Sequence, residues 1–189
     1  MKLSVIGAGK IGGTIGEKWE AAGHEVLYGL RDPSKKAGAK SIAQSLSGAE
    51  AVLLAVPANA LKQLAHEHAK ELDGKILIDA TNHFGGAKYH QWDELARSVP
   101  HAHLYRAFNS YGFDVFENAT LGGTQADLFF AGPEGAGKAR VEKLIEDVGL
   151  RPVWVGGAEH SDTVDGVLVL WLTLSRIHGR RIAFKLLTD

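Results

Sequence analysis

Residues 3–12 read Leu-Ser-Val-Ile-Gly-Ala-Gly-Lys-Ile-Gly, and they carry the strongest fold signal in the chain. An apolar run of strand type, Leu3–Ile6, leads directly into a G-x-G-x-x-G motif, and a helical pattern follows from about Lys10 to Ala22. In this setting the first glycine permits a tight turn, the second leaves room for a pyrophosphate and the third lets helix and strand pack closely. Backbone N–H groups at the start of the helix favour an anion. The loop residues predicted to bind a dinucleotide are Gly7, Ala8, Gly9, Lys10, Ile11 and Gly12.

Short apolar runs alternate with longer helical patterns from the N-terminus to about Gly157. This alternation predicts an α/β fold of Rossmann type, with a doubly wound, mostly parallel sheet and residues 1–157 as its nucleotide-binding domain. The segment from Pro33 to Gly48 is too short for a helix, a strand and a second helix, so an abbreviated crossover is expected. The predicted strands are Leu3–Ile6, Glu25–Tyr28, Ala51–Val56, Ile76–Asp79, His103–Ala107, Asp127–Ala131 and Pro152–Val155, and the predicted helices are Lys10–Ala22, Ala60–Leu72, Tyr89–Val99 and Glu134–Val148.

The alternation stops after Gly157, and residues 158–189 are predicted to form a helical appendage. Apolar residues at helical spacing favour one long helix from Asp162 to Leu187. Its broad apolar surface could dock on the protein's own sheet or mark an interface, and we expect a homodimer formed through it. The residues predicted on this surface are Val167, Leu170, Trp171 and Leu174.

The composition excludes several classes of protein. The chain has 189 residues, of which 45% are hydrophobic, so it can bury a full core. Its formal net charge of -1 leaves no basic excess for a nucleic acid or an anionic membrane surface. It contains no cysteine, which excludes disulfides, thiolate nucleophiles and Cys-ligated metals. The apolar start is too short for a signal peptide and no apolar run approaches the ~20 residues of a membrane span, so a cytoplasmic protein is expected.

The end of the second strand indicates which dinucleotide is bound. A carboxylate about 20 residues after the glycine loop would hold the ribose 2′-hydroxyl of NAD, and this chain has Leu30 and then Arg31 there. An arginine can form two hydrogen bonds with a 2′-phosphate, so NADP is predicted, with Lys35 assisting. Asp32 is the counter-evidence, and we interpret it as the N-cap of a helix that has Pro33 at its first position.

Three loops at the carboxyl ends of predicted strands should line the reactive half of the cofactor, because ligands bind beyond these ends in an open parallel sheet. They follow Val56, Asp79 and Ala107 and are rich in amides, aromatic rings and glycine. Such residues suit a flat ring held by stacking and neutral hydrogen bonds, although Asn is also an ordinary turn residue. Predicted beside the cofactor are Ala55, Val56, Pro57, Thr81 and Asn82, and beside a second, acceptor ring are His83, Phe84, Phe108, Asn109, Ser110 and Tyr111.

The nine histidines raise the question of a metal site. His66 and His68 form one pair and His101 and His103 another, and neither pair has a third ligand at a zinc-like spacing. No metal site is therefore predicted. His83 is the histidine that we single out, as a proton donor or ring contact beside the nicotinamide, and no other catalytic residue is predicted.

With these loops in view, the chain resembles the NADP oxidoreductases that reduce or oxidise the deazaflavin coenzyme F420. The resemblance rests on Val5–Gly12, Gly29–Arg31, Leu54–Pro57, Asp79–Asn82, Arg106–Ser110 and Ala183–Leu187, which are spread over nearly the whole chain. It implies that Arg31 contacts the 2′-phosphate and that Val56-Pro57 and Thr81-Asn82 approach the nicotinamide. The same fold family includes a cytoplasmic ferric-reductase domain that passes hydride to a flavin.

The chain departs from the family pattern in two places. Leu30 stands where the family often has a small hydroxyl residue, which removes one contact to the phosphate. The loop after Asn82 reads His-Phe-Gly-Gly and differs from the Pro-containing loops of deazaflavin reductases. F420, FMN and FAD therefore all stay open as acceptors.

The predicted reaction is hydride transfer between NADP(H) and a flavin-like ring, either deazaflavin F420 or a flavin. Two stacked rings carry the reactivity themselves, so the protein mainly holds them in contact. The acceptor ring is expected between the sheet and the C-terminal helix, with Phe108, Asn109 and Ser110 at the floor. The alternatives are a reductase of a small imine or keto substrate, and a non-catalytic NADP(H) sensor. Relatives with imine or hydroxyacid substrates use a longer helical second domain, often with a lysine on its first helix, whereas roughly 30 residues follow the sheet here.

Overall fold

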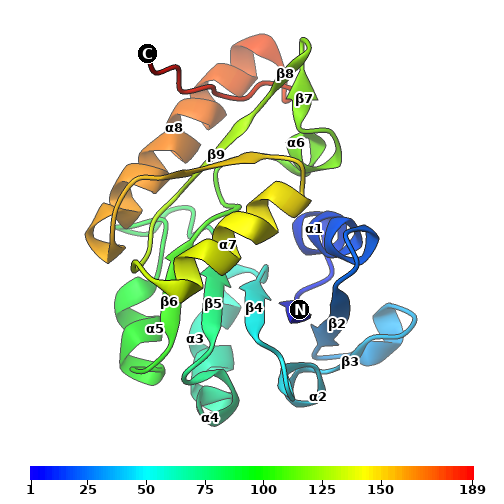
Figure 1. Ribbon diagram of the computed structural model, residues 1–189. Coiled ribbons are helices and arrows are strands. Elements are labelled where there is room, and N and C mark those ends of the chain that lie inside the picture. The colour runs from blue at the N-terminus through cyan, green and yellow to red at the C-terminus, as the bar shows by residue number, and fades with distance from the viewer.

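The central sheet holds six parallel strands in the order β3-β2-β1-β4-β5-β6, in a computed structural model that describes residues Met1–Asp189 (Figure 1). Between β1 and β4 the direction of strand addition reverses, which is the topological switch point of a doubly wound sheet. The predicted α/β fold of Rossmann type is therefore confirmed. The strands are β1 (Lys2–Ile6), β2 (Glu25–Leu30), β3 (Lys40–Ser41), β4 (Ala51–Leu54), β5 (Ile76–Asp79) and β6 (His103–Arg106).

Helices cover both faces of the sheet, because successive strand residues point to opposite sides and both sides are apolar. In β4, Leu53 belongs to a core shared with α1, α6, α7 and α8, and its neighbours Val52 and Leu54 belong to a second core under α2, α3, α4 and α5. None of the helices is both long and apolar enough to cross a membrane. Their bounds are α1 (Lys10–Ala21), α2 (Ile42–Leu46), α3 (Ala58–Glu67), α4 (Ala69–Leu72), α5 (Trp92–Ser98), α6 (Phe113–Glu117), α7 (Ala136–Asp147) and α8 (Ser161–His178).

The second crossover is short, as predicted for the segment from Pro33 to Gly48. It consists of the 3-10 turn η1 (Pro33–Lys35), the two-residue strand β3 and the five-residue helix α2. Ser41 caps α2 by accepting a hydrogen bond from the Gln44 amide, and the Gln44 side chain accepts one from the Ser41 amide. This capping box stabilises a helix that is too short to stand on propensity alone.

The last two predicted strands do not extend the central sheet. Strands β9 (Asp127–Phe130) and β10 (Arg151–Trp154) form a parallel pair of their own. Ala131, directly after β9, makes an antiparallel bridge to Arg106 at the end of β6. The chain therefore passes the edge of the central sheet against the strand direction and cannot continue its parallel ladder. A small hairpin of β7 (Thr120–Leu121) and β8 (Thr124–Gln125) was not anticipated in the sequence analysis.

The C-terminal helix is shorter than predicted, since α8 ends at His178 and the expected continuation to Leu187 is wrong. Gly179, with φ of 80°, leaves the helical conformation. The tail beyond it runs back along the molecule (Figure 1), where the Ile182 carbonyl accepts a hydrogen bond from the Trp171 indole at 2.9 Å. The Leu186 amide donates to the buried carboxylate of Asp127 at 2.7 Å. These partners for the tail's backbone lie in β9 and α8, and no local pattern predicts them.

Helix α8 uses one face for the core and leaves the other in solvent. Leu168 and Trp171 are buried, whereas Leu170 is 49% and Ile177 72% exposed. Of the predicted surface, Trp171 therefore packs inward and Leu170 outward. The helix does dock on the protein's own core, and the homodimer stays a prediction.

Candidate functional site

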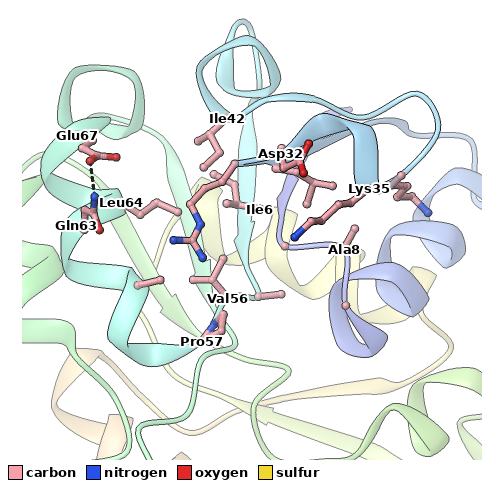
Figure 2. A pocket seen from close by; sticks show the side chains of 18 residues that line it. Ile6, Ala8, Asp32, Lys35, Ile42, Val56, Pro57, Gln63, Leu64 and Glu67 are labelled. Atoms are coloured by element: carbon pink, nitrogen blue, oxygen red, sulfur yellow. Dashed lines mark hydrogen bonds between the residues drawn. The ribbon is translucent and has the colours of Figure 1, made fainter.

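A cavity of about 490 Å³ lies at the carboxyl ends of β1, β2 and β4, at the switch point of the sheet (Figure 2). The glycine loop forms its floor on one side, and the end of β2 with η1 forms its rim. Helix α3 closes the opposite side, so that Gln63, Leu64 and Glu67 face Asp32 and Lys35 across the opening (Figure 2). The volume and the position are those of a nucleotide site in this class of fold.

Glycine stands at the three loop positions for different structural reasons. Gly7 has φ of 98°, and a Cβ atom at Gly12 would overlap the Gly7 carbonyl oxygen. Both glycines are thus required by the loop itself. A Cβ atom at Gly9 would meet no protein atom within 4 Å, so the protein's own packing does not explain a glycine there.

The residues present fit a pyrophosphate at this place. Gly9 is the N-cap of α1, no side chain caps the helix, and its first turn holds no acidic residue. The first amides of α1 and its positive dipole end are therefore available to an anion. Open space over Gly9 gives that anion a direct approach to the backbone, which supports the predicted role of Gly7–Gly12.

Three cationic side chains stand at the rim where a 2′-phosphate is expected. Arg31 and Lys35, both predicted, line the cavity and are exposed. Lys36 lines it too, with its Nζ 4.3 Å from the centre of the Tyr28 ring and 4.0 Å from a Glu17 carboxylate oxygen. The sequence analysis missed Lys36, although its position directly after Lys35 was a signal. Leu30 lines the cavity as well.

The Asp32 carboxylate stays ionised near Lys35 and is held in place by local hydrogen bonds. It accepts hydrogen bonds from the hydroxyl of Ser34 at 2.6 Å and from the Ser34 amide at 3.1 Å. These bonds hold the pKa of Asp32 below its usual value. Asp32 caps η1, whose first residue is Pro33, so the interpretation as an N-cap is confirmed.

The wall formed by α3 is the part of the cavity that the sequence analysis did not identify. Gln63 donates a hydrogen bond to Glu67 at 2.7 Å, and Leu64 lies beside them (Figure 2). Ile42 and Val56 add apolar surface to the cavity. A flat, partly polar ring such as a purine fits between walls of this kind. Predicted residues Ala55 and Pro57 also line the cavity.

Beyond β5, the backbone at Thr81 is held from two sides. The Asp79 carboxylate accepts hydrogen bonds from the Thr81 amide at 2.9 Å and its hydroxyl at 2.7 Å. The Arg106 guanidinium donates to the Thr81 carbonyl at 2.5 Å. Asn82 accepts from Arg106 at 2.8 Å and donates to the Asn109 carbonyl at 2.9 Å. The Asn82 amide group thus links two loops and has both ends occupied.

Arg106 is the centre of a fully buried polar network. Its Nε and Nη2 both donate to Oδ1 of Asp165 in α8, at 2.9 and 2.7 Å. Asn109 donates to the same oxygen at 3.0 Å. Oδ2 of Asp79 lies 3.1 Å from Nη1 of Arg106, but Nη1 directs its hydrogens to the carbonyls of Asp79 and Thr81.

The network leaves Oδ2 of Asp79 and Oδ2 of Asp165 buried without a hydrogen-bond donor. Burial raises the pKa of Asp165 above its usual value, and the Arg106 charge opposes that rise. Sequence reasoning quoted Arg106 only as part of a motif and missed Asp165. The available signal was a charged residue inside an apolar strand and another on the apolar stripe of a helix.

The residues predicted at the floor of an acceptor site are buried. Phe108 packs in the core, edge-on to Trp19 and Phe116 at 6.0 and 5.8 Å between ring centres. The Tyr111 hydroxyl donates to the Asp127 carbonyl at 2.8 Å. The two side chains are only 1% and 4% exposed, so neither offers a surface to an acceptor ring, which corrects their expected place. Asn109 and Ser110 are buried as well.

Phe108 is the only non-glycine residue with a positive φ, at 61°. This conformation is strained for an aromatic residue, and the packing of the ring against the core holds it. It turns the chain sharply, so that Asn109 directs its amide towards Asp165 and its carbonyl towards Asn82. Sequence reasoning placed Phe108 in the right turn and gave its ring the wrong environment.

The structure separates the predicted acceptor residues into two groups. His83 and Phe84 lie in the exposed loop between β5 and α5, and Phe84 is 63% exposed. Phe108 through Tyr111 lie in the core below. The structure therefore does not bring the two groups together around one opening.

Residues 2–83 match the model of the family NADP oxidoreductase coenzyme F420-dependent. The match covers less than half of the 189 residues, but it includes the glycine loop, Arg31 and Thr81-Asn82. Over this part it confirms the resemblance found in the sequence and the coarse prediction of an NADP-dependent oxidoreductase.

Solved structures with the same fold extend over more of the chain. A candidate F420-dependent NADP reductase from Arthrobacter sp. FB24 is 24% identical, with a TM-score of 0.85 and 100% of both chains covered. A hypothetical protein from Sinorhizobium meliloti is 26% identical, with a TM-score of 0.71, and the match covers 86% of this chain and 88% of that one. A reductive aminase from Aspergillus terreus in complex with NADPH and ethyl levulinate is 17% identical, with a TM-score of 0.67. The match to it covers 94% of this chain but only 62% of the aminase.

Proposed function

Starting from an N-terminal part that matches the NADP oxidoreductases, we propose that this protein transfers a hydride between NADP(H) and a flavin-like ring, deazaflavin F420 or a flavin. The observation that carries the proposal is the cavity at the switch point, which combines an open glycine loop with three rim cations. A family match over these same residues supports it.

The residues around the cavity would bind the cofactor in separate parts. Arg31, Lys35 and Lys36 would pair with the 2′-phosphate, because charge-assisted hydrogen bonds to phosphate are strong and NAD lacks that group. The amides at Gly9 and the start of α1 would bind the pyrophosphate. The α3 wall at Leu64 would contact the adenine.

The network around Arg106 would orient the nicotinamide end of the cofactor. NADPH, when bound, supplies the hydride, and the protein's task is to keep that ring at contact distance from an acceptor. Thr81 and Asn82 are held by Asp79, Arg106 and Asn109, so the chain after β5 has a fixed position beside the expected ring. His83, in the exposed loop that follows, is retained as a candidate ring contact or proton donor.

A second candidate function is reduction of a small imine or keto substrate. The observation in its favour is the fold shared with a reductive aminase solved with NADPH. The ring acceptor is preferred because the match to the candidate F420-dependent reductase spans both chains completely, whereas the aminase match leaves over a third of that enzyme uncovered.

The test follows NADPH oxidation by the purified protein with deazaflavin F420, riboflavin, FMN and FAD offered separately, and with an imine and a keto acid in parallel. Turnover with one of the ring acceptors is the expected result. Turnover confined to the imine or keto acid would establish the second candidate instead. Tight NADPH binding without turnover on any acceptor would overturn the proposed enzymatic activity and favour a non-catalytic NADP(H) sensor.

The proposal includes two further expectations, one about the oligomeric state and one about the cellular location. A homodimer through α8 is supported by the exposed side chains of Val169, Leu170 and Ile177 on one face of that helix. A cytoplasmic location is retained as a proposal, to be tested by cell fractionation with the native protein.

A further inference from the structure

The buried network around Arg106 has an uneven charge. Arg106 contributes one positive charge, and Asp79 and Asp165 contribute one negative charge each when both are ionised. The exposed fractions of these side chains are 0%, 2% and 5%. Because solvent does not reach them, one negative charge is left without compensation inside the protein.

Within the network itself, Arg106 is the only cation. His90 is close, since one atom each of His90, Asp162 and Asp165 lie within 4.8 Å of one another. The Trp92 amide donates to Nδ1 of His90 at 3.3 Å, so the proton of a neutral ring sits on Nε2, which donates to Asp162 at 3.0 Å. Lys88 pairs with Asp162 at 3.6 Å and not with Asp165. The uncompensated charge therefore belongs to the Asp79–Arg106–Asp165 network.

The network lies beside the place proposed for the nicotinamide. Asp79 pairs with Leu54 across the β4–β5 ladder, and Arg106 pairs with Asp79 across the next one. Ala55 follows Leu54 and lines the cofactor cavity. Asp79 is thus one strand away from the strand that leads into the cavity wall, and its carboxylate holds Thr81. Asp165 joins it through Arg106, which donates to both Asp165 and the Thr81 carbonyl.

A nicotinamide ring carries a positive charge when oxidised and none when reduced. A buried negative charge near the ring attracts the positively charged, oxidised nicotinamide but not the neutral, reduced one. Low-dielectric surroundings strengthen that attraction. We infer that the Asp79–Arg106–Asp165 network favours NADP⁺ over NADPH at this site, with Asp165 as the residue whose ionisation sets the preference. The inference rests on the proposed function, because it needs the nicotinamide to lie at Thr81-Asn82.

Because Asp165 can be protonated, the preference for NADP⁺ over NADPH should depend on pH. Burial raises the pKa of this carboxyl, Arg106 and the nearby His90 oppose the rise, and Asp79 adds to it. When Asp165 is protonated, the network is neutral and its preference for the cation is lost. Binding of NADP⁺ should therefore release a proton, and the ratio of the NADP⁺ and NADPH dissociation constants should fall as pH rises through the pKa of Asp165. Titration of the 2′-phosphate cancels in this ratio, because both forms carry it.

The test measures equilibrium dissociation constants of NADP⁺ and NADPH by calorimetry, for the native protein, D165N and D162N. Asn at position 165 keeps the acceptor for Arg106 and Asn109 but removes the charge. We expect D165N to raise the Kd ratio of NADP⁺ to NADPH by about tenfold at the upper end of the pH range. D162N is the matched control, one helical turn away, where the carboxylate is 63% exposed and screened by water.

Equal ratios for D165N and the native protein at every pH, with normal folding by circular dichroism, would overturn the inference. If D165N does not fold, the pH scan of the native protein decides alone, and a ratio that does not change between about pH 5 and pH 9 overturns the inference. Turnover with a ring acceptor but an unaltered ratio would remove this inference and leave the proposed function. A pH-dependent ratio without turnover on any acceptor would support this inference and overturn the proposed hydride transfer.

Discussion

The two ends of the cofactor site are built differently. The end proposed for the adenosine and its phosphates is an open cavity of about 490 Å³, whose cations Arg31 and Lys35 are exposed to solvent. The end proposed for the nicotinamide rests on side chains that are almost entirely buried, and Arg106 holds it together with contacts to β5, α8 and the loop after β5. In the proposed function, exposed groups would therefore recognise the cofactor and buried, hydrogen-bonded groups would orient its reactive ring.

The two ends should also differ in how much they contribute to the stability of the fold. Exposed cations at a rim contribute little to folding, because water screens them and their side chains lose entropy when fixed. A buried ion network gives little net stability as a whole, yet removing one member leaves the others uncompensated and is strongly destabilising. Substitutions at the two ends should thus separate binding from stability.

The largest effect is expected for R106M. This change leaves Asp79 and Asp165 buried without their cation and should lower the free energy of unfolding by about 3–5 kcal/mol, measured by urea denaturation. R97M is the control, because Arg97 is 72% exposed and pairs with Glu94 at the surface, where a loss of up to ~1 kcal/mol is expected. Similar stabilities for the two variants would show that the network does not hold the fold.

A strong effect on binding, without one on stability, is expected for G9A. The added methyl group meets no protein atom within 4 Å, and φ at this position is -72°, so alanine fits the fold. It stands where the pyrophosphate should lie, and the Kd for NADPH should rise at least about tenfold. G13A, in the first turn of α1 and with only an ordinary contact to the Ala8 carbonyl, should bind NADPH normally. Unchanged affinity in G9A would place the pyrophosphate elsewhere.

A selective effect is expected for R31Q. Loss of the charge that faces the 2′-phosphate should weaken NADPH binding by about tenfold and leave NADH binding unchanged, because NADH lacks the phosphate. Thermal shifts or calorimetry with both nucleotides measure this. K40Q serves as control, since Lys40 is exposed at the start of β3 and does not line the cavity. An equal loss for both nucleotides would assign Arg31 to a part that NAD and NADP share.

The smallest effect on the site is expected for L170K. Leu170 is 49% exposed on the outer face of α8, and neither end of the cofactor site contacts it. A charge at this position should turn the proposed dimer into a monomer in light scattering and leave the Kd for NADPH unaltered. A native protein that is already monomeric at micromolar concentration would refute the dimer without touching the rest of the proposal.

Much of the site could be predicted because the residues that form it are close in the sequence. The glycine loop belongs to one strand–turn–helix unit, and Arg31 follows at the end of the strand that returns beside it. The Asp32 cap and its Pro33 are local too, since the hydrogen bonds go to Ser34, two residues away. Periodicity and turn chemistry describe interactions of this range well.

Local sequence patterns were thus enough to predict the Rossmann-type unit, the glycine loop proposed to bind the phosphates and the preference for NADP. Only the tertiary structure decided that β9 leaves the central sheet, that the tail after Gly179 folds back on Asp127 and that Phe108 enters the core. It also decided that Arg106 meets Asp165, although 59 residues separate them. The physical reason is that burial depends on which surfaces meet, and a charge in an apolar strand can be interpreted only when its partner from a distant helix is in place.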